Sequence, residues 1–334
     1  MKILLAYYHP VIYDLAETLL KLGSVESVDI CVVKDLSDNY GGPTNVFKKV
    51  KENKHLDKTK VFYDSVAHQL IKAGAYDIVG VDGVFSGDDL IMELCQENKI
   101  PYFCINGYPH QLDEPSHNIM AFSWHLPQVQ YKQANPHEGY VKERDWKDIS
   151  QNGRSQGKNV FVFYPEMNEA KRFHSKSRTR TLESATSPYF LSLIHRYAEC
   201  NRWNHEVFNL IGKLYKVENF STLTQEQSFK KILLSDGLLH LKHGDCPGIS
   251  VLEALILGKP VITMESFVKA SFNQEVLIDE YNSIICQSVG EMAERMRDIR
   301  PINPRATEYI WDLTSFSRQR RGLLRFLRGC RESV

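Results

Sequence analysis

The chain has 334 residues with 41 basic and 41 acidic side chains, so its formal net charge is zero. Hydrophobic residues make up 43% and charged residues 25%, which excludes a disordered or fibrous chain. No apolar run approaches the roughly 20 residues that span a bilayer. The opening MKILLAYY has no signal-peptide cleavage pattern, so we expect a cytoplasmic protein of two domains.

The seven cysteines are scattered through the chain at positions 31, 95, 104, 200, 246, 286 and 330. They are odd in number and form no CxxC pair, whereas zinc cages and disulfide frameworks use regular spacings. We therefore expect reduced thiols, no disulfide framework and no zinc site.

The arginines are concentrated in the second half of the chain. Residues 1–150 carry 15 basic against 21 acidic side chains, and only one of the 17 arginines, Arg144, lies among them. Because the guanidinium group binds phosphate with two parallel hydrogen bonds, a phosphorylated ligand is expected in the second half.

Apolar strand-like runs alternate with amphipathic segments along the first half, which indicates parallel sheets covered by helices. The predicted strands are residues 2–8, 28–33, 77–81 and 101–105. The predicted helices are residues 13–22 and 61–73, and a third that begins at Ser86.

A polar stretch with two glycines, QNGRSQGKN at 151–159, marks the predicted domain boundary. A second alternation follows, with strands expected at 160–164, 207–211, 237–242 and 260–264. Ser187 and Pro188 predict the start of a helix over 188–200, and another helix is expected to end at Leu257. The sequence therefore predicts an α/β protein with two doubly wound domains.

The most informative segment is HLKHGDCPGISVLEALILGKPVITMES at 240–266. A buried strand leads through a polar turn into a helix, and Gly258 and Pro260 end that helix before the next strand. Ligands of such sheets bind at the carboxyl ends of strands, where helix N-termini point. The amides of Gly248, Ile249 and Ser250 would form a phosphate site there.

Asp245 and Glu253 lie eight positions apart, one in the turn and the other one turn inside the helix. Both could accept hydrogen bonds from hydroxyls on either side of a bound phosphate, as a sugar nucleotide offers. A purely structural explanation is a capping box of Ser250 with Glu253, with Asp245 as an ordinary turn residue.

Residues 245–262, DCPGISVLEALILGKPVI, resemble the E-x-F-G-x-x-x-x-E signature and trailing G-x-P-V of retaining GT-B glycosyltransferases in the glycogen-synthase-like family four. The resemblance implies two Rossmann-like domains that face an interdomain cleft. It implies an acceptor domain at 1–150, a nucleotide-sugar donor domain at 151–306 and a C-terminal helix at 307–334 that crosses back to the first domain. Asp245, in place of the family's Glu, would hold the transferred sugar and Glu253 the ribose.

The same resemblance implies cations for the donor diphosphate and a histidine near the donor sugar. The family places its cations after the first strand of the second domain, which we take as residues 160–164. The candidates that follow this strand are Lys171, Arg172, Lys176, Arg178 and Arg180. The family's histidine corresponds to His110, with Asp113 and His117 as alternatives, and a structural role in hydrogen bonding is the other explanation of His110.

The implied function is transfer of a hexose, with retention, from a nucleotide diphosphate sugar such as UDP-glucose. The donor is a substrate, and no tightly bound cofactor is expected. No D-x-D triplet occurs in the chain, which agrees with a metal-independent mechanism. The alternatives are a sugar-nucleotide 2-epimerase and a catalytically inactive nucleotide-sugar-binding protein.

The acceptor stays open among a glycan, a lipid-linked glycan and a hydroxymethylated base of viral DNA. Two basic stretches could contact a membrane surface or DNA: Lys48–Lys60, with six lysines, and the arginine-rich tail at 318–331. The structural alternative is a solvated lysine loop and a final helix packed on the first domain.

Overall fold

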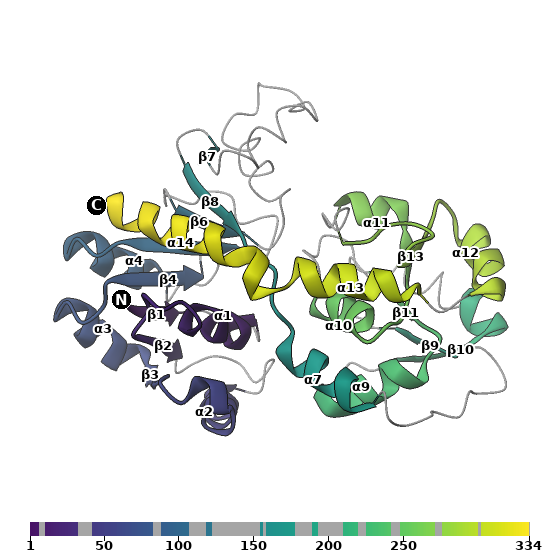
Figure 1. Cartoon of the computed structure of the whole chain (residues 1–334), viewed down its shortest axis with the longest axis horizontal. Coiled ribbons are helices and arrows are strands. Elements are labelled where there is room, and N and C mark those ends of the chain that lie inside the picture. The colour runs from purple at the N-terminus through teal and green to yellow at the C-terminus, as the bar shows by residue number, and fades with distance from the viewer. Residues whose placement is uncertain are drawn as a thin grey trace. The chain divides into compact units, whose positions relative to one another are not determined.

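The computed structural model describes residues 1–6, 11–32, 42–82, 88–106, 118–121, 154–155, 158–177, 189–192, 210–219, 225–241, 248–270, 276–299 and 302–333 (Figure 1). Contacts divide the chain into two compact units. The first comprises Met1–Glu166 together with Phe316–Val334, and the second comprises Met167–Ser315.

The first unit contains an eight-stranded sheet in the order β3-β2-β1-β4-β5-β6-β8-β7. Its strands are β1 (Lys2–Ala6), β2 (Ser27–Val32), β3 (Val61–Tyr63), β4 (Ile78–Asp82), β5 (Tyr102–Asn106), β6 (Asn118–Ala121), β7 (Arg154–Ser155) and β8 (Lys158–Val162). All pairs are parallel except β7 with β8. The order 3-2-1-4-5-6 of the first six strands is that of a doubly wound nucleotide-binding sheet.

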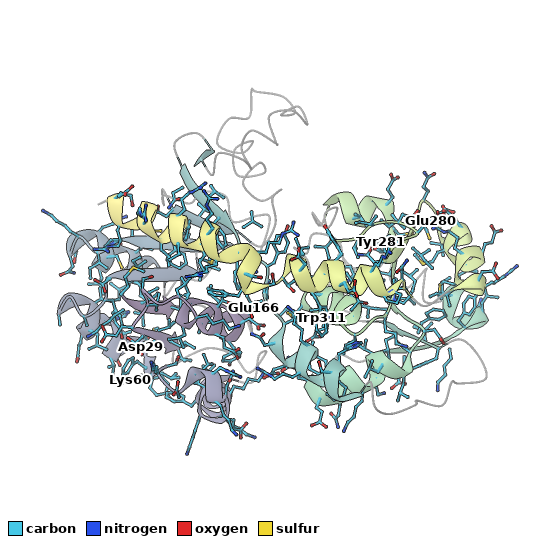
Figure 2. The ribbon with its side chains drawn as sticks, in the orientation of Figure 1. Asp29, Lys60, Glu166, Glu280, Tyr281 and Trp311 are labelled. Atoms are coloured by element: carbon cyan, nitrogen blue, oxygen red, sulfur yellow. The ribbon has the colours of Figure 1, made fainter. Side chains whose placement is uncertain are left out.

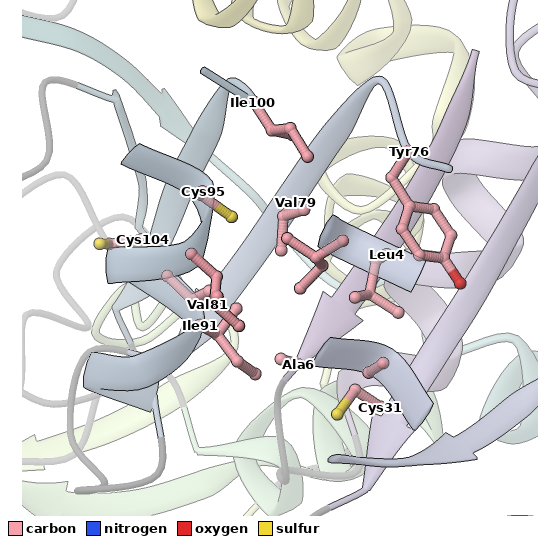
Figure 3. Close-up of a cluster of buried hydrophobic side chains, with 13 residues drawn as sticks. Leu4, Ala6, Cys31, Tyr76, Val79, Val81, Ile91, Cys95, Ile100 and Cys104 are labelled. Atoms are coloured by element: carbon pink, nitrogen blue, oxygen red, sulfur yellow. The ribbon is translucent and has the colours of Figure 1, made fainter. Parts of the chain in front are cut away.

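The helices of this unit are α1 (Val11–Leu20), α2 (Gly42–Glu52), the short 3₁₀ helix η2 (Lys54–Leu56), α3 (Asp64–Lys72), α4 (Asp88–Glu97) and the C-terminal α14 (Phe316–Glu332). Figure 3 shows one side of the core, where strand residues such as Val79 and Val81 meet Ile91 and Cys95 from α4. Most residues of the central strands are buried and apolar, because helices cover both faces of a parallel sheet.

Helix α14 packs against β6 and β8 of the first unit. The ring of Phe326 contacts the rings of Phe103 and Phe161, with centroids 5.4 and 5.9 Å away. The amide of Asn159 donates to the Phe326 carbonyl at 2.9 Å and to the side-chain oxygen of Asn118 at 3.0 Å. Leu323, Phe326 and Leu327 of the arginine-rich tail are therefore buried inside this unit.

The second unit contains a five-stranded parallel sheet in the order β10-β9-β11-β12-β13. Its strands are β9 (Tyr189–Ser192), β10 (Lys216–Asn219), β11 (Gly237–Leu239), β12 (Val261–Met264) and β13 (Ser283–Cys286). Its helices are α7 (Asn168–Ser177), α9 (Gln225–Leu234), α10 (Ile249–Ile256), α11 (Glu265–Ala270), α12 (Val289–Arg295), η3 (Met296–Asp298) and α13 (Pro304–Leu313).

Several segments differ from the sequence-based prediction, among them residues 61–63, the expected start of a helix, which form β3 and pair with β2. Residues 189–192, expected to be helical, form β9, because this segment pairs with strands on both of its sides. Residues 210 and 211, the end of the strand expected at 207–211, are helical. The strand expected to open the second domain, β8, belongs to the first sheet, where it pairs with β6.

No helix in the described part of the chain combines the length and the hydropathy needed to cross a membrane.

Candidate functional site

The carboxyl ends of the parallel strands β9, β11, β12 and β13 share one edge of the second sheet. The strand order reverses direction between β9, the first strand in sequence, and β11. Ligands of doubly wound sheets bind outside the carboxyl ends at such a reversal point. Helix α10 is the next described element after β11, so its N-terminus follows the strand at this point.

Helix α10 begins after Gly248, whose φ of −56° and ψ of 139° are those of extended backbone. The N-cap residue is a glycine and therefore offers no side-chain cap to the first amides of the helix. Gly248, Ile249 and Ser250 are all partly exposed. Because the first amides of a helix lack partners within it and carry partial positive charge, this end can accept an anion.

The capping-box explanation of Glu253 does not hold in the structure. That motif requires Ser250 at the N-cap, but the N-cap is Gly248 and Ser250 is the second residue of the helix. Glu253 is therefore not at the position from which a side chain closes a capping box.

Glu253 is a buried carboxylate with 7% of its surface exposed. The residues around it on α10, from Val251 to Ile256, are also buried and otherwise apolar. A carboxylate in such a place needs polar partners, from the protein, from a ligand or from both. It is the one buried carboxylate among the described residues of the second unit.

The buried carboxylates of the first unit have clear structural roles. Asp29 accepts hydrogen bonds from the Lys60 amide at 3.0 Å and from the Tyr76 hydroxyl at 3.1 Å (Figure 2). Burial, together with this carboxylate, raises the pKa of Tyr76. Glu17 accepts from the Asn53 amide at 2.5 Å, and Glu166 pairs with Lys21. We therefore assign none of these to a ligand.

Two further polar side chains lie at the same strand edge, and the sequence analysis did not identify them. The amide of His240 donates to the Ile262 carbonyl at 2.9 Å, so in register His240 continues β11 beside Thr263 of β12. Both residues are buried, with 4% and 0% of their surface exposed. The Thr263 hydroxyl has no hydrogen-bond partner among the described residues.

Strand alternation puts His240 and Thr263 on the face of the sheet that α10 covers. Leu239, Leu241 and Ile262 belong to a core cluster that includes residues of α12, so they face the other way. Helix α10 contributes nothing to that cluster and packs on β11 and β12. His240 and the Thr263 hydroxyl thus lie on the sheet face that α10 covers, at the carboxyl ends of β11 and β12. Glu253 is carried by that same helix. Neither has a sequence signal, because only the strand register aligns them.

The C-terminal end of α10 forms a Schellman motif. Gly258 ends the helix, as the sequence predicted. Gly258 has a φ of +78°, its amide donates to Leu255 at 3.1 Å and the Lys259 amide donates to Ala254 at 2.8 Å. Burial lowers the pKa of Lys259, against the opposing effect of Asp236. The two hydrogen bonds end the helix at Gly258, at the end away from the candidate site.

Helix α7 carries some of the predicted cations and packs against α10. Phe173 contacts Phe229, and the ring of His174 lies edge-on to Trp311 with centroids 5.7 Å apart. The Trp311 indole in turn donates to the Ile256 carbonyl at 3.3 Å, so α13 also packs on α10 (Figure 2).

The topology corrects the basis on which these cations were chosen. The strand before α7 is β8 of the first sheet, whereas the first strand of the second sheet is β9. Arg172 is exposed, and Lys176 lies within α7. His110, Arg178, Arg180 and Asp245 lie outside the described residues. Among the residues that are described, no cluster of three or more His, Cys, Asp or Glu could hold a metal ion.

Comparison of the sequence with protein families and with curated proteins gives no match. The fold is similar to that of S. aureus TarM, solved with Fondaparinux, alpha-GlcNAc-glycerol and UDP, at a TM-score of 0.61 and 9% identity over 98% of this chain and 99% of that chain. It is similar to UDP-N-acetylglucosamine 2-epimerase from Rickettsia bellii, at a TM-score of 0.60 and 10% identity over 100% and 98%.

A third similar structure is sucrose-phosphate synthase from Thermosynechococcus elongatus, at a TM-score of 0.55 and 13% identity over 100% of both chains. Glycosyltransferases and an epimerase are thus among the proteins with this fold. At these identities the likeness concerns the fold alone. Together with the two doubly wound units, it shows that the chain has the GT-B fold.

Proposed function

We propose that the chain is a retaining glycosyltransferase that moves a hexose from a nucleotide diphosphate sugar, with a UDP sugar as the first candidate. The observation that carries this proposal is Glu253, a buried carboxylate on the helix that follows β11 at the reversal point of the second sheet. A strand edge of this kind is where the fold binds nucleotides.

Glu253 would accept hydrogen bonds from the ribose hydroxyls. The amides at the start of α10, from Gly248 to Ser250, would hold the diphosphate, since the N-cap glycine offers them no side-chain cap and the helix dipole favours negative charge there. In this arrangement the Glu253 carboxylate and the first amides of α10 bind one ligand.

Asp245 would hold the transferred sugar, with His110 close to it. Arg172, Lys176, Arg178 and Arg180 are the candidates for offsetting the charge that develops on the leaving diphosphate, usually a large contribution to catalysis. The acceptor hydroxyl would attack on the face that the diphosphate leaves and pass its proton to a phosphate oxygen. No side-chain base is then required, and a glycan, a lipid-linked glycan or a hydroxymethylated DNA base could each supply the hydroxyl.

A 2-epimerase acting on a UDP sugar is the second candidate. The observation in its favour is buried His240, which lies at the same strand edge and could act as an acid or base. Incubation with UDP-N-acetylglucosamine alone separates the two functions, because an epimerase forms product without an acceptor. Tight UDP binding without turnover in either assay would instead indicate an inactive binding protein.

Thermal-shift titration with UDP, GDP and ADP sugars tests the proposed donor site. We expect one nucleotide series to stabilise the protein, and Glu253→Gln to weaken that binding by about tenfold or more, the effect of about 1.4 kcal/mol. The matched control is Glu294→Gln, an exposed glutamate of the same unit. Equal binding by the wild type and Glu253→Gln would overturn the assignment.

A further inference from the structure

The exposed face of α14 is densely cationic. Six arginines lie within this helix of 17 residues: Arg318, Arg320, Arg321, Arg325, Arg328 and Arg331. All six are exposed, and Glu332 is the one acidic residue of the helix. At 3.6 residues per turn they occupy the side opposite to buried Leu323, Phe326 and Cys330. We call these six residues the arginine face.

Most of the arginine face forms no ion pair within the part of the chain that the structure describes. Among the described residues, Arg320, Arg321, Arg325, Arg328 and Arg331 form no salt bridge. Arg295 of the second unit, by contrast, pairs with Asp279 at 2.9 Å. Like charges three and four positions apart on a helix repel each other, so this arrangement costs stability unless an anion binds to it.

An open groove of about 510 Å³ runs beside this helix. The described residues that line it all belong to α14: Ser317, Arg320, Arg321, Leu324, Arg325 and Arg328. Four cations therefore lie in a row along this groove, where the phosphates of a linear anion could contact them in turn.

We propose that the arginine face binds a single strand of nucleic acid through its phosphates. The guanidinium group matches a phosphate with two parallel hydrogen bonds. From Arg320 to Arg328 the helix rises about 12 Å. A strand that runs along this length can place a few of its phosphates against the four arginines that line the groove. The face carries no aromatic side chain for base stacking, so the contact is independent of base sequence.

The packing of α14 disfavours a membrane as the partner. An amphipathic helix binds in a bilayer interface through its apolar face. Here that face is used inside the first unit, where Leu323, Phe326 and Leu327 are at most 2% exposed. Long duplex DNA is disfavoured as well, because residues 1–150 of the same unit carry more acids than bases and would repel phosphates beyond the groove.

This inference does not depend on the proposed donor site, because the arginine face lies in the first unit and Glu253 in the second. The Glu253→Gln variant should bind a strand as the wild type does. A failure of one proposal is thereby distinguishable from a failure of the other.

Fluorescence anisotropy with a labelled oligothymidylate strand of about 20 nucleotides, longer than one typical binding site, tests the proposal. We expect salt-dependent binding, with a slope of log K against log salt of about −0.7 for each phosphate contacted and no steeper than about −3 for four arginines. The combined variant Arg321→Gln, Arg325→Gln and Arg328→Gln should reduce affinity by at least about tenfold at about 50 mM salt and flatten this slope. Circular dichroism melting verifies that the variant remains folded.

The matched control removes three exposed lysines at and just after α2, by Lys48→Gln, Lys51→Gln and Lys54→Gln, with the same change in net charge. It should leave strand binding within about twofold, since none of these lysines lines the groove. Three results would overturn the proposal: no strand binding at low salt, an equal loss in the lysine variant, or tighter binding to duplex DNA. Arginine-dependent binding to anionic phosphatidylserine vesicles without strand binding would identify a membrane surface instead.

Discussion

The side chain of Gln319 and the backbone of Tyr164 exchange two hydrogen bonds. The Gln319 amide donates to the Tyr164 carbonyl at 2.8 Å, and the Tyr164 amide donates to the Gln319 side-chain oxygen at 2.9 Å. Both bonds are buried. They join α14 to the chain just beyond β8, close to where the first unit ends at Glu166.

Replacement of Gln319 by Leu should destabilise the protein, because it removes a hydrogen-bond partner from a buried amide and a buried carbonyl of Tyr164. We expect a loss of about 2 to 4 kcal/mol in the free energy of unfolding, measured by urea denaturation. Arg320→Ala, at the exposed neighbouring position, should change it by less than about 0.5 kcal/mol. Similar losses in both variants would show that the pair has no special role.

Gly329 is required for the close approach of α14 to β8. A Cβ atom there would lie 2.6 Å from the Asn159 side-chain nitrogen, which is held by its own hydrogen bonds. Gly329→Ala should therefore lower stability by about 1 to 2 kcal/mol despite the better helix propensity of Ala. In α12, a Cβ atom at Gly290 would lie 3.9 Å from the nearest atom, so Gly290→Ala should be neutral or stabilising. Urea denaturation measures both variants.

Much of the fold could be predicted from the sequence because buried parallel strands are continuous apolar runs. The expected strands at 28–33 and 77–81 correspond to β2 and β4 within one residue at each end. The order of strands in a sheet leaves no such local signal. β9 was missed because Ser187 and Pro188 look like a helix start, whereas pairing with β10 and β11 decides its conformation. β8 was assigned to the wrong sheet because strand order leaves no local signal in the sequence.

The Lys21 ammonium is the partner of a buried carboxylate, Glu166, whose side chain is 6% exposed. The other oxygen of Glu166, Oε1, has no hydrogen-bond partner among the described residues. Lys21→Met should therefore cost about 2 kcal/mol, because it leaves the charge unpaired. In a double-mutant cycle with Glu166→Gln, the second substitution should recover about 1 kcal/mol or more. Strictly additive losses would contradict a direct pairing.

Burial raises the pKa of the Cys95 thiol to about 12. An unfolded chain releases this proton above a pH of about 8.5, while the folded protein retains it. The associated stability is thus full below that pH and falls by about 1.4 kcal/mol per pH unit as the pH rises toward 12. Urea denaturation under reducing conditions should show a shallower pH dependence for Cys95→Ala than for the wild type.

Ile91→Val, in the same core cluster, is the control for this pH dependence. It removes a methylene group but no titrating group, so it should lower stability by a similar amount at every pH. An unchanged slope in Cys95→Ala would contradict the role assigned to the thiol.

Of the candidate site, the sequence predicted the helix that follows β11, its glycine exit and the carboxylate on it. It could not separate a ligand-binding Glu253 from a capping residue, because S-x-x-E is compatible with both. The observed N-cap at Gly248 separates them. His240 and Thr263 are 23 positions apart and meet only through the pairing of β11 with β12, which no short motif records.

A crystal structure of the protein with UDP would test the donor site most directly. We predict the ribose hydroxyls against the Glu253 carboxylate and the diphosphate at the first amides of α10. A nucleotide bound away from the start of α10, with Glu253 remote from its ribose, would contradict the proposed site.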